Sequence, residues 1–339
     1  MKALVLVGML AQIVVARYSL KPCSHNEVCI QLRKCSNYKH YANQPSRNWL
    51  NKVRICNWEN TDKNEIVSIC CPTAMNQKKC GVHLQTDRIA NGKEAVPFQF
   101  PWMALLEDHK GNFLCGGTLI SDRYVLTAAH CVRNVKITSV RLGENNIYQK
   151  KDCITTGAYK ECADPPQDIT VMDVILHPKY SNRFKVNDIA LLRLKRNAVL
   201  SASVRPVCIP GRSKAELSIN PSRLYIAGWG LTKDSKSFDV LRYAPVLPMS
   251  HKECGPKVRQ LNNAVKLKES HVCARGANQE DTCPGDSGGP ALYISNRTAQ
   301  FVQYGVVSFG ARSCGQPGVP GVYTRVDQFV DWIHEQIDR

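Results

Sequence analysis

The chain has 339 residues, of which 43% are apolar, so it is long enough for one large domain or two medium domains with a buried core. Its formal charge of +17 raises the question of a polyanionic partner, but the basic residues are spread along the chain without a dense arginine run. We therefore expect a solvated basic surface and no nucleic-acid partner, and docking to an acidic partner stays open.

Residues 1–16 have the pattern of a secretory signal peptide. Lys2 precedes a short apolar run from Ala3 to Val15, and Val14-Val15-Ala16 offers small residues for cleavage. This run is too short to span a bilayer, and no later segment is long and apolar enough to anchor the chain. We expect a secreted, extracellular protein with no membrane partner.

The chain contains 16 cysteines, an even number that agrees with secretion, because disulfides persist outside the cell. The alternative is a zinc site. Paired CxxC ligands at zinc spacing are missing from the sequence, and the histidines do not cluster with the cysteines. Disulfides are therefore the better account of the cysteines.

Residues 17–72 read as a separate small domain with six cysteines and few long apolar runs, so it needs covalent cross-links to fold alone. Spacing alone leaves many pairings open. Two short gaps, one long gap and an adjacent final pair followed by Pro72 resemble the clip domain of arthropod serine proteases. That resemblance implies the pairs Cys23–Cys70, Cys29–Cys56 and Cys35–Cys71. A cross-linked module without a partner of its own is the alternative.

Residues 73–88 are polar and read as an exposed linker. From Ile89 onward, short β-branched and apolar runs are broken by Gly, Pro, Asn and Asp, which predicts an antiparallel barrel or sandwich. The apolar positions from Val326 to Arg339 recur at helical intervals, which predicts a C-terminal helix with its apolar stripe in the core. Typical strand runs are Phe113 to Ile120, Val140 to Leu142, Ile189 to Leu194, Leu224 to Gly228 and Phe301 to Phe309.

Three motifs carry candidate catalytic residues. A serine hydroxyl is a poor nucleophile unless a base takes its proton and fixed N–H groups receive the oxyanion, and the base needs a carboxylate to hold its tautomer. Glycines around Ser287 let the backbone turn so that the N–H groups of Gly285 and Ser287 point together. The motifs are Leu126-Thr127-Ala128-Ala129-His130-Cys131, Asn187-Asp188-Ile189-Ala190-Leu191-Leu192 and Asp281-Thr282-Cys283-Pro284-Gly285-Asp286-Ser287-Gly288-Gly289-Pro290.

In this order, His, Asp and Ser, the motifs resemble the three signatures of the chymotrypsin-like serine proteases. The resemblance implies that His130 is the general base and acid, Asp188 its orienting carboxylate and Ser287 the nucleophile, with an oxyanion hole formed by Gly285 and Ser287. It also implies an all-β protease domain over residues 89–339, made of two six-stranded antiparallel β-barrels with a C-terminal helix. A protease-shaped regulator that has lost a catalytic residue is disfavoured, because all three residues are present.

The same resemblance implies the substrate class. Asp281, six residues before Ser287, would lie at the base of the primary specificity pocket, where a carboxylate favours a long cationic side chain. Gly310 and Gly321 match the small walls that admit such a chain. Phe309 stands on the cleft wall in place of the usual tryptophan, and Pro284 stiffens the approach to the oxyanion loop, which together favour narrow selectivity. We expect cleavage after Arg or Lys.

Arg88 and Ile89 resemble the activation site of the family. There, an aliphatic residue becomes a new N-terminus after cleavage, and its ammonium pairs with the carboxylate before the catalytic serine, here Asp286. A buried carboxylate without a partner is costly, so the new charge of Ile89 would hold the oxyanion loop in its working shape. We interpret the chain as a zymogen.

The resemblance further implies four disulfides in or before the protease domain and leaves two cysteines, Cys153 and Cys162, to close one small loop. The four implied pairs are Cys80–Cys208, Cys115–Cys131, Cys254–Cys273 and Cys283–Cys314.

The chemistry requires no cofactor, but one loop resembles the calcium loop of clip-domain proteases. Glu144, Asn146 and Asp152, with a carbonyl near Gln149, offer the oxygen ligands that Ca²⁺ prefers. Two lysines in the loop dilute its negative charge, so a solvated turn is an equal alternative. Elsewhere, Asn296 in Asn296-Arg297-Thr298 is a candidate N-glycosylation acceptor.

The domain plan resembles arthropod proteases that cut other zymogens in haemolymph cascades leading to prophenoloxidase activation or to the Toll ligand Spätzle. It implies three partners: an upstream trypsin-like activating protease, a downstream zymogen or pro-ligand as substrate, and a serpin-type inhibitor. One alternative is a digestive or venom trypsin, against which the clip segment argues. The other is a noncatalytic clip-type adaptor, against which the complete triad argues.

Overall fold

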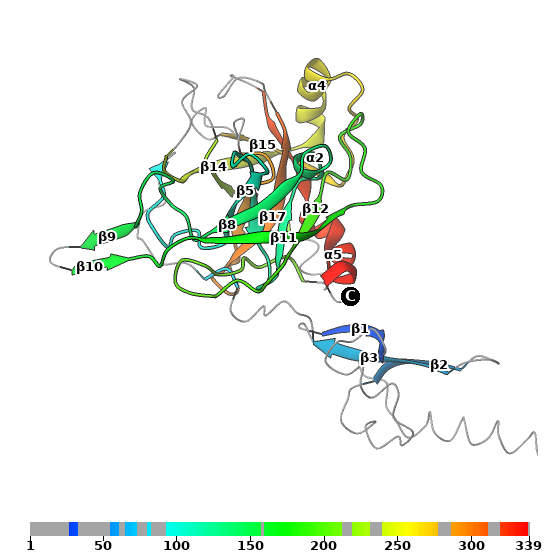
Figure 1. Ribbon diagram of the computed structural model, residues 1–339. Helices are drawn as coiled ribbons and strands as arrows, with labels where there is room; N and C mark the ends of the chain where they lie inside the picture. Colours follow the sequence, from blue (N-terminus) through cyan, green and yellow to red (C-terminus); the bar gives the residue numbers. More distant parts are fainter. Residues whose placement is uncertain are drawn as a thin grey trace, which may run out of the picture. The chain divides into compact units, whose positions relative to one another are not determined.

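The computed structural model describes residues 27–32, 55–60, 65–72, 80–82, 93–156, 159–211, 219–230, 239–276, 286–310 and 319–337. The chain divides into two compact units, one with three strands from the N-terminal part and one with most of the β-structure (Figure 1). No helix in these ranges is long and apolar enough to cross a membrane.

The small unit contains a three-stranded antiparallel sheet in the order β1-β3-β2. Ile55 and Ile69 are buried in it, and a disulfide between Cys29 and Cys56 joins the two outer strands across the central one. Few apolar side chains are buried in the described part of this unit, so we expect the cross-link to supply part of its stability. The strands are β1 (Glu27–Gln31), β2 (Ile55–Asn60) and β3 (Glu65–Pro72).

The first barrel of the large unit is closed, antiparallel and six-stranded, in the order β11-β12-β7-β6-β5-β8. Leu106, Leu126, Val140 and Leu142 are fully buried in it, as expected for apolar residues that alternate along strands. The strands are β5 (Met103–Asp108), β6 (Phe113–Leu119), β7 (Tyr124–Thr127), β8 (Ile137–Leu142), β11 (Gln167–Leu176) and β12 (Ala190–Leu194).

The second barrel runs in the order β13-β16-β17-β18-β15-β14 and closes through pairing of β13 with β14, and the short β4 (Lys93–Glu94) extends it at β14. Its core cluster includes Leu224, Val246, Ala274 and Tyr323. The predicted all-β fold of two six-stranded antiparallel barrels is thereby confirmed. The strands are β13 (Leu224–Gly228), β14 (Arg242–Met249), β15 (His271–Gly276), β16 (Pro290–Ile294), β17 (Phe301–Phe309) and β18 (Gly321–Arg325).

Aromatic side chains fill the junction between the barrels. Phe301 of β17 lies 5.4 Å from Trp102 and 5.8 Å from Phe100 between ring centroids, and Phe100 lies 5.3 Å from Tyr243 of β14. Large buried rings contribute much of the energy of such a junction. This aromatic packing fixes the position of one barrel on the other, and both barrels contribute residues to the candidate active site.

The described ranges contain few helices. The predicted C-terminal helix is present but begins as a 3₁₀ turn, η4 (Val326–Phe329), before α5 (Val330–Ile337), and its apolar stripe is buried. The helix α4 (His251–Leu261) was not predicted, because Gly255 and Pro256 interrupt any helical pattern. The one signal for it is a capping box, in which Ser250 and Glu253 bond each other's backbone N–H.

A hairpin leaves the first barrel between β8 and β11. It consists of β9 (Cys153–Thr156) and β10 (Tyr159–Cys162), and Cys153 pairs opposite Cys162 in the sheet register and in a disulfide. These are the two cysteines that the other expected pairs left over.

Candidate active site

His130 and Asp188 are brought together by the pairing of β7 with β12. Thr127 near the end of β7 stands opposite Ala190 at the start of β12, so the residues beyond these two ends meet. His130 is the second residue of α2 (Ala129–Val132), which follows β7 directly, and Asp188 precedes β12. Antiparallel register therefore explains why a histidine and an aspartate far apart in the sequence are neighbours.

The imidazole and the carboxylate form a tight pair. Nδ1 of His130 donates to Oδ2 of Asp188 over 2.8 Å, and the backbone N–H of His130 donates to Oδ1 over 2.9 Å. Asp188 is fully buried. Burial alone would raise the pKa of Asp188, but hydrogen bonds from His130 and Ser308 hold this pKa below its ordinary value. The charged carboxylate fixes the proton on Nδ1 and leaves Nε2 as the basic nitrogen.

The second barrel supports the same aspartate. Oγ of Ser308, in β17, donates to Oδ2 of Asp188 over 2.5 Å, and Oγ1 of Thr324, in β18, donates to its backbone carbonyl over 2.9 Å. Sequence reasoning missed both residues. Ser308 stands beside Gly310, which was singled out for the substrate pocket, but nothing in the sequence marks Thr324.

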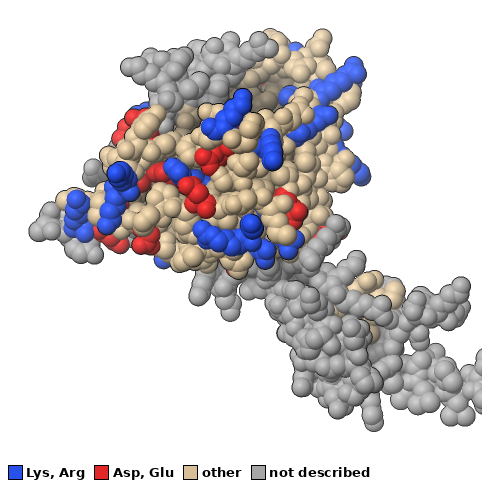
Figure 2. Space-filling view, viewed as in Figure 1, with Lys and Arg blue, Asp and Glu red and all other residues tan. Residues whose placement is uncertain are grey.

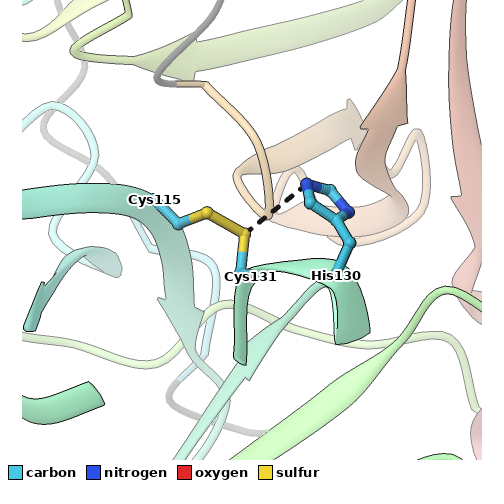
Figure 3. A group of neighbouring side chains, drawn as sticks. All are labelled: Cys115, His130 and Cys131. Atoms are coloured by element: carbon cyan, nitrogen blue, oxygen red, sulfur yellow. Dashed lines mark hydrogen bonds between the residues drawn. A yellow bond between two sulfur atoms is a disulfide. The ribbon is translucent and has the colours of Figure 1, made fainter. Parts of the chain in front are cut away.

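A disulfide next to His130 also holds the histidine in place. Figure 3 shows Cys131 bonded to Cys115 of β6, with Nε2 of His130 at 3.7 Å from the sulfur of Cys131. The two sulfurs are bonded to each other, so they do not act as thiolate ligands for a metal. Their role is to anchor α2 to the barrel.

The turn that carries Ser287 lies against the strands that lead to His130. The backbone N–H of Gly116, in β6, donates to the carbonyl of Ser287 over 2.8 Å, and Gly288 donates to Val307 of β17 over 3.0 Å. Gly288 has φ +78°, and a side chain there would collide with Thr127 and with the carbonyl of Gly116. Only glycine suits this position. Gly285, the other expected oxyanion donor, lies outside the described residues.

Asp286 sits on the backbone at the end of β13. Its Oδ1 accepts a hydrogen bond from the N–H of Gly230 over 2.8 Å. A Cβ atom on Gly228 or Gly230 would overlap the carboxylate of Asp286, so glycine at these two positions leaves the room that the carboxylate occupies. Sequence reasoning did not identify them, although both lie in the short motif Gly228-Trp229-Gly230. The expected activation residues, Arg88 and Ile89, fall outside the described part of the chain.

The predicted walls of the substrate pocket lie together. A Cβ atom on Gly310 would approach the Cα atom of Gly321 to 3.5 Å, so side chains larger than hydrogen would narrow the space there. Phe309 is half-buried next to them and meets the ring of His271 edge to face, with centroids 6.4 Å apart. Asp281, expected at the base of the pocket, lies outside the ranges that the structure describes.

Only some of the expected calcium ligands lie close to one another. Asp152 Oδ2 accepts from the N–H groups of Asn145 and Asn146, at 3.0 and 3.2 Å, and Glu144 Oε1 also accepts from Asn145 at 3.0 Å, so the two buried carboxylates share one loop. Burial and the charge of Asp152 raise the pKa of Glu144. The side-chain oxygen of Asn146 accepts from a backbone N–H in its own turn. Gln149 is exposed.

The remaining expected residues are placed as follows. Asn296 is exposed in the turn between β16 and β17. Five of the expected cysteine pairs are disulfides in the structure, and each of the other three includes at least one cysteine outside the described residues. The five are Cys29–Cys56, Cys80–Cys208, Cys115–Cys131, Cys153–Cys162 and Cys254–Cys273.

Comparison with known proteins agrees with this geometry. Residues 89–333 match the family model described as Trypsin. The crystal structure of the Drosophila Grass clip serine protease of the Toll pathway matches with a TM-score of 0.69 at 30% identity, covering 94% of this chain and 97% of that one. Mouse neuropsin, a serine protease expressed in the limbic system, matches with a TM-score of 0.57 at 32% identity, covering 73% and 98%.

Curated relatives extend over most of both chains. Phenoloxidase-activating factor 3 of Holotrichia diomphalia is 34% identical over 93% of this chain and 92% of its own. The CLIP domain-containing serine protease HP8 of Bombyx mori is 34% identical over 94% and 93%. Serine protease grass of Drosophila melanogaster is 36% identical over 80% and 76%. With a trypsin-type fold, a paired histidine and aspartate, and these relatives, the chain belongs to the clip-domain serine proteases of the trypsin family and is a serine endopeptidase.

Proposed function

We propose that this chain is a secreted zymogen, activated by cleavage after Arg88, that cuts protein substrates after Arg or Lys in an extracellular immune cascade. The observation that carries the catalytic part is the hydrogen-bonded pair of His130 and buried Asp188 beside the turn of Ser287. The layout we propose is a signal peptide over residues 1–16, a clip domain over 17–72, a linker over 73–88 and a protease domain over 89–339.

In the proposed mechanism, Oγ of Ser287 attacks the carbonyl carbon of the scissile bond while Nε2 of His130 takes its proton. Charged Asp188 stabilises the imidazolium that forms, and the N–H groups of Gly285 and Ser287 receive the oxyanion. His130 then gives the proton to the leaving amine, which departs and leaves an acyl-enzyme. Water repeats the sequence with the same base and releases the carboxylate product.

Activation would act through Asp286. Its carboxylate is seated on the backbone of Gly228 and Gly230, next to the turn of Ser287. A new ammonium at Ile89 would add an ion pair to the hydrogen bonding of this partly buried carboxylate, and a charge-assisted contact of this kind would hold its loop more firmly. The activating enzyme would itself cut after Arg, so it would be trypsin-like.

Substrate choice would rest on Asp281, with Gly310 and Gly321 as walls. The adjacency of these two glycines supports a pocket that admits a long side chain. Arg would gain most, because its planar guanidinium forms two hydrogen bonds with one carboxylate.

Calcium would be a structural ion. The buried carboxylates of Glu144 and Asp152 fit a cation, because two like charges in one loop are stabilised by an opposite charge between them. Asn146 and a carbonyl near Gln149 would complete the ligands after a local change in the loop. The ion would rigidify this loop and supply nothing to the proton transfers.

The cascade role is supported by the relatives, one named as a phenoloxidase-activating factor and another as a protease of the Toll pathway. By this proposal, an upstream protease cuts the chain in the haemolymph, the chain cuts a zymogen or pro-ligand, and a serpin-type inhibitor ends its activity.

The test is hydrolysis of a chromogenic peptide that ends in Arg, before and after a verified cut at Arg88, with Ser287→Ala as the control. We expect activity only after the cut and only with Ser287. Full activity before the cut would contradict the zymogen. No activity after the cut, with disulfides formed and calcium present, would favour a noncatalytic adaptor. Broad cleavage of unrelated proteins would favour a digestive enzyme.

A further inference from the structure

Two surface segments near the active site carry many cations and few acids. The loop over residues 177–187, between β11 and β12, has three basic side chains and no acidic one. The segment from Lys252 to Lys268, which covers α4 and the loop after it, has five basic residues against Glu253 alone. Their exposed cations form a surface that we call the basic flank: Lys179, Arg183, Lys252, Arg259, Lys266 and Lys268.

The two segments meet at one buried histidine. Nε2 of His271 donates to the backbone carbonyl of Lys185, over 2.7 Å, and the backbone N–H of Lys268 donates to its Nδ1, over 3.0 Å. The loop and the chain after α4 therefore lie side by side, on the right of Figure 1. His271 thus joins the loop over residues 177–187 to the chain that follows α4.

The cations of the basic flank outnumber the acids beside them, which are Glu253 and Glu269, next to Lys252 and Lys268 in the sequence. None of its six side chains forms an ion pair with a residue in the described part of the chain. Figure 2 shows blue side chains without red ones over the upper right, where α4 and the loop lie in Figure 1. A cluster of one sign raises the local concentration of oppositely charged partners and speeds their association.

Exposed apolar side chains are interleaved with these cations. Phe184 is 47% exposed, between Arg183 and Lys185, and the guanidinium of Arg183 lies 5.3 Å from the centre of its ring. Leu261, at the end of α4, is 38% exposed. Protein-binding surfaces combine aromatic anchors with charges in this way. A sulfated polysaccharide, which offers no apolar side chains, would leave Phe184 and Leu261 unused.

Part of the basic flank lies close to the candidate catalytic residues. Lys185, held by His271, is three residues before Asp188. The ring of His271 in turn contacts Phe309, beside the expected pocket wall Gly310. A substrate bound at the candidate catalytic residues would therefore lie close to the loop over residues 177–187.

We propose that the basic flank is a docking surface for an acidic stretch of the protein substrate, outside the residues that enter the cleft. This proposal rests on the proposed function, because the substrate must occupy the cleft at the same time. Charge complementarity of this kind gives selectivity and a faster encounter, in addition to the choice of Arg or Lys in the pocket.

The test uses the full chain cut after Arg88 and three peptides with one shared cleavage core. One peptide carries four Glu residues before the core, one carries them after it, and one carries four Gln residues instead. We expect at least one acidic peptide to be cleaved with a kcat/KM about 5- to 10-fold higher than the Gln peptide at low salt, and this advantage to fall as salt rises.

Two charge-reversal variants locate the effect. The Lys179→Glu, Arg183→Glu, Lys268→Glu variant should lose the advantage and cleave the Gln peptide as before. The control, Lys110→Glu, Lys160→Glu, Arg196→Glu, changes the net charge equally at exposed positions elsewhere and should keep the advantage.

The outcomes separate the two proposals. Cleavage of the Gln peptide without an advantage for either acidic peptide would overturn the docking surface and leave the protease function standing. The docking surface would also be overturned if the advantage of the acidic peptides survived reversal of the basic flank or was lost equally in the control variant. It would likewise be overturned if a sulfated polysaccharide competed with the acidic peptides and a free Glu-rich peptide did not. Cleavage of no peptide at all would contradict the proposed function, and the docking proposal with it.

Discussion

Asp188 stays charged in a fully buried position because donors surround it. His130 provides two of them and Ser308 a third, so the free energy lost on burial is recovered through hydrogen bonds to the charged form. Because its folded pKa is depressed, its ionisation stabilises the native state above the unfolded pKa, and this contribution is lost as the pH falls through the folded pKa. The catalytic geometry and part of the stability therefore depend on the same contacts.

Removing the Ser308 hydroxyl should lower both the catalytic activity and the stability of the protein. In Ser308→Ala, the pKa of Asp188 moves up toward its ordinary value, and the imidazole of His130 is held less firmly. We expect kcat/KM for an Arg peptide to fall about tenfold, or about 1.4 kcal/mol, and the free energy of unfolding at neutral pH to fall by about 1.5–3 kcal/mol. Steady-state kinetics and urea unfolding measure the two effects.

The matched control is Ser203→Ala, another buried serine, which lies outside the catalytic cluster. It should leave kcat/KM unchanged. If Ser308→Ala loses stability but no activity, the hydroxyl has a structural role only, and its proposed support of the catalytic carboxylate is wrong.

Residues such as Ser308 and Thr324 could not be found from the sequence, because each acts on Asp188 from more than a hundred positions away, across the junction of the barrels. His130 and Asp188 were recognisable, since each stands in a motif of its own. Asp281 and Gly285, which the sequence marks equally clearly, lie outside the described residues and stay predictions.

At the scale of elements, strands were easier to predict than helices. The β-branched and apolar run from Phe301 to Phe309 predicted β17 with its observed bounds, and β13 was likewise matched from Leu224 to Gly228. α4 was missed because its interior carries Gly255 and Pro256, and tertiary contacts override these weak local preferences. A disulfide from Cys254 to Cys273 ties this helix to β15.

His271 joins β15 to the loop before Asp188, and only in its neutral form. Its Nε2 donates while its Nδ1 accepts, so protonation would remove the acceptor for Lys268. Burial lowers the pKa of His271 in the folded protein. Below the unfolded value of about 6.5, the unfolded chain takes up a proton that the native chain does not, so stability falls as the pH falls.

Replacement by glutamine should reduce this acid sensitivity. The amide of His271→Gln can donate to Lys185 and accept from Lys268 but does not titrate. We expect the variant to lose about 1–2 kcal/mol at pH 7.5 through weaker packing on Phe309, and to show a smaller drop in unfolding free energy between pH 7.5 and 5.5 than the parent. Denaturant unfolding at both values measures this. The exposed control His109→Gln should keep the full drop, and an equal drop in all three proteins would contradict the account.

At the scale of the whole molecule, function depends on the junction of two barrels that are each complete. His130 and Asp188 come from the first barrel, the hydroxyls that bond Asp188 come from the second, and Gly116 of β6 holds the turn of Ser287. A buried hydrogen bond of 2.5 Å between Thr118 and Gln303 also crosses the junction. Small displacements between barrels would therefore misalign the catalytic groups before either barrel unfolds.

The segment before the expected cut after Arg88 is tied into this large unit. Cys80 is bonded to Cys208 in a disulfide. The N–H of Gly81 donates to the carbonyl of Pro206, and the carbonyl of Gly81 accepts from the N–H of Phe301, both over 2.9 Å. The expected cut after Arg88 lies between these two cysteines in the sequence. The N-terminal fragment should therefore stay attached to the protease after activation, through a covalent bond that does not depend on any contact of the clip domain.

Electrophoresis of the cut protein tests this attachment. We expect one band without reductant and two bands with it. Cys80→Ser combined with Cys208→Ser should give two bands in both conditions and release the N-terminal fragment on gel filtration, because a few backbone hydrogen bonds, each worth about 1 kcal/mol net, do not hold a free chain end. Cys153→Ser with Cys162→Ser, a pair that lies wholly after the cut, should leave the fragment attached. Release of the fragment from the unmodified protein without reductant would show that the bond between Cys80 and Cys208 does not form in the protein.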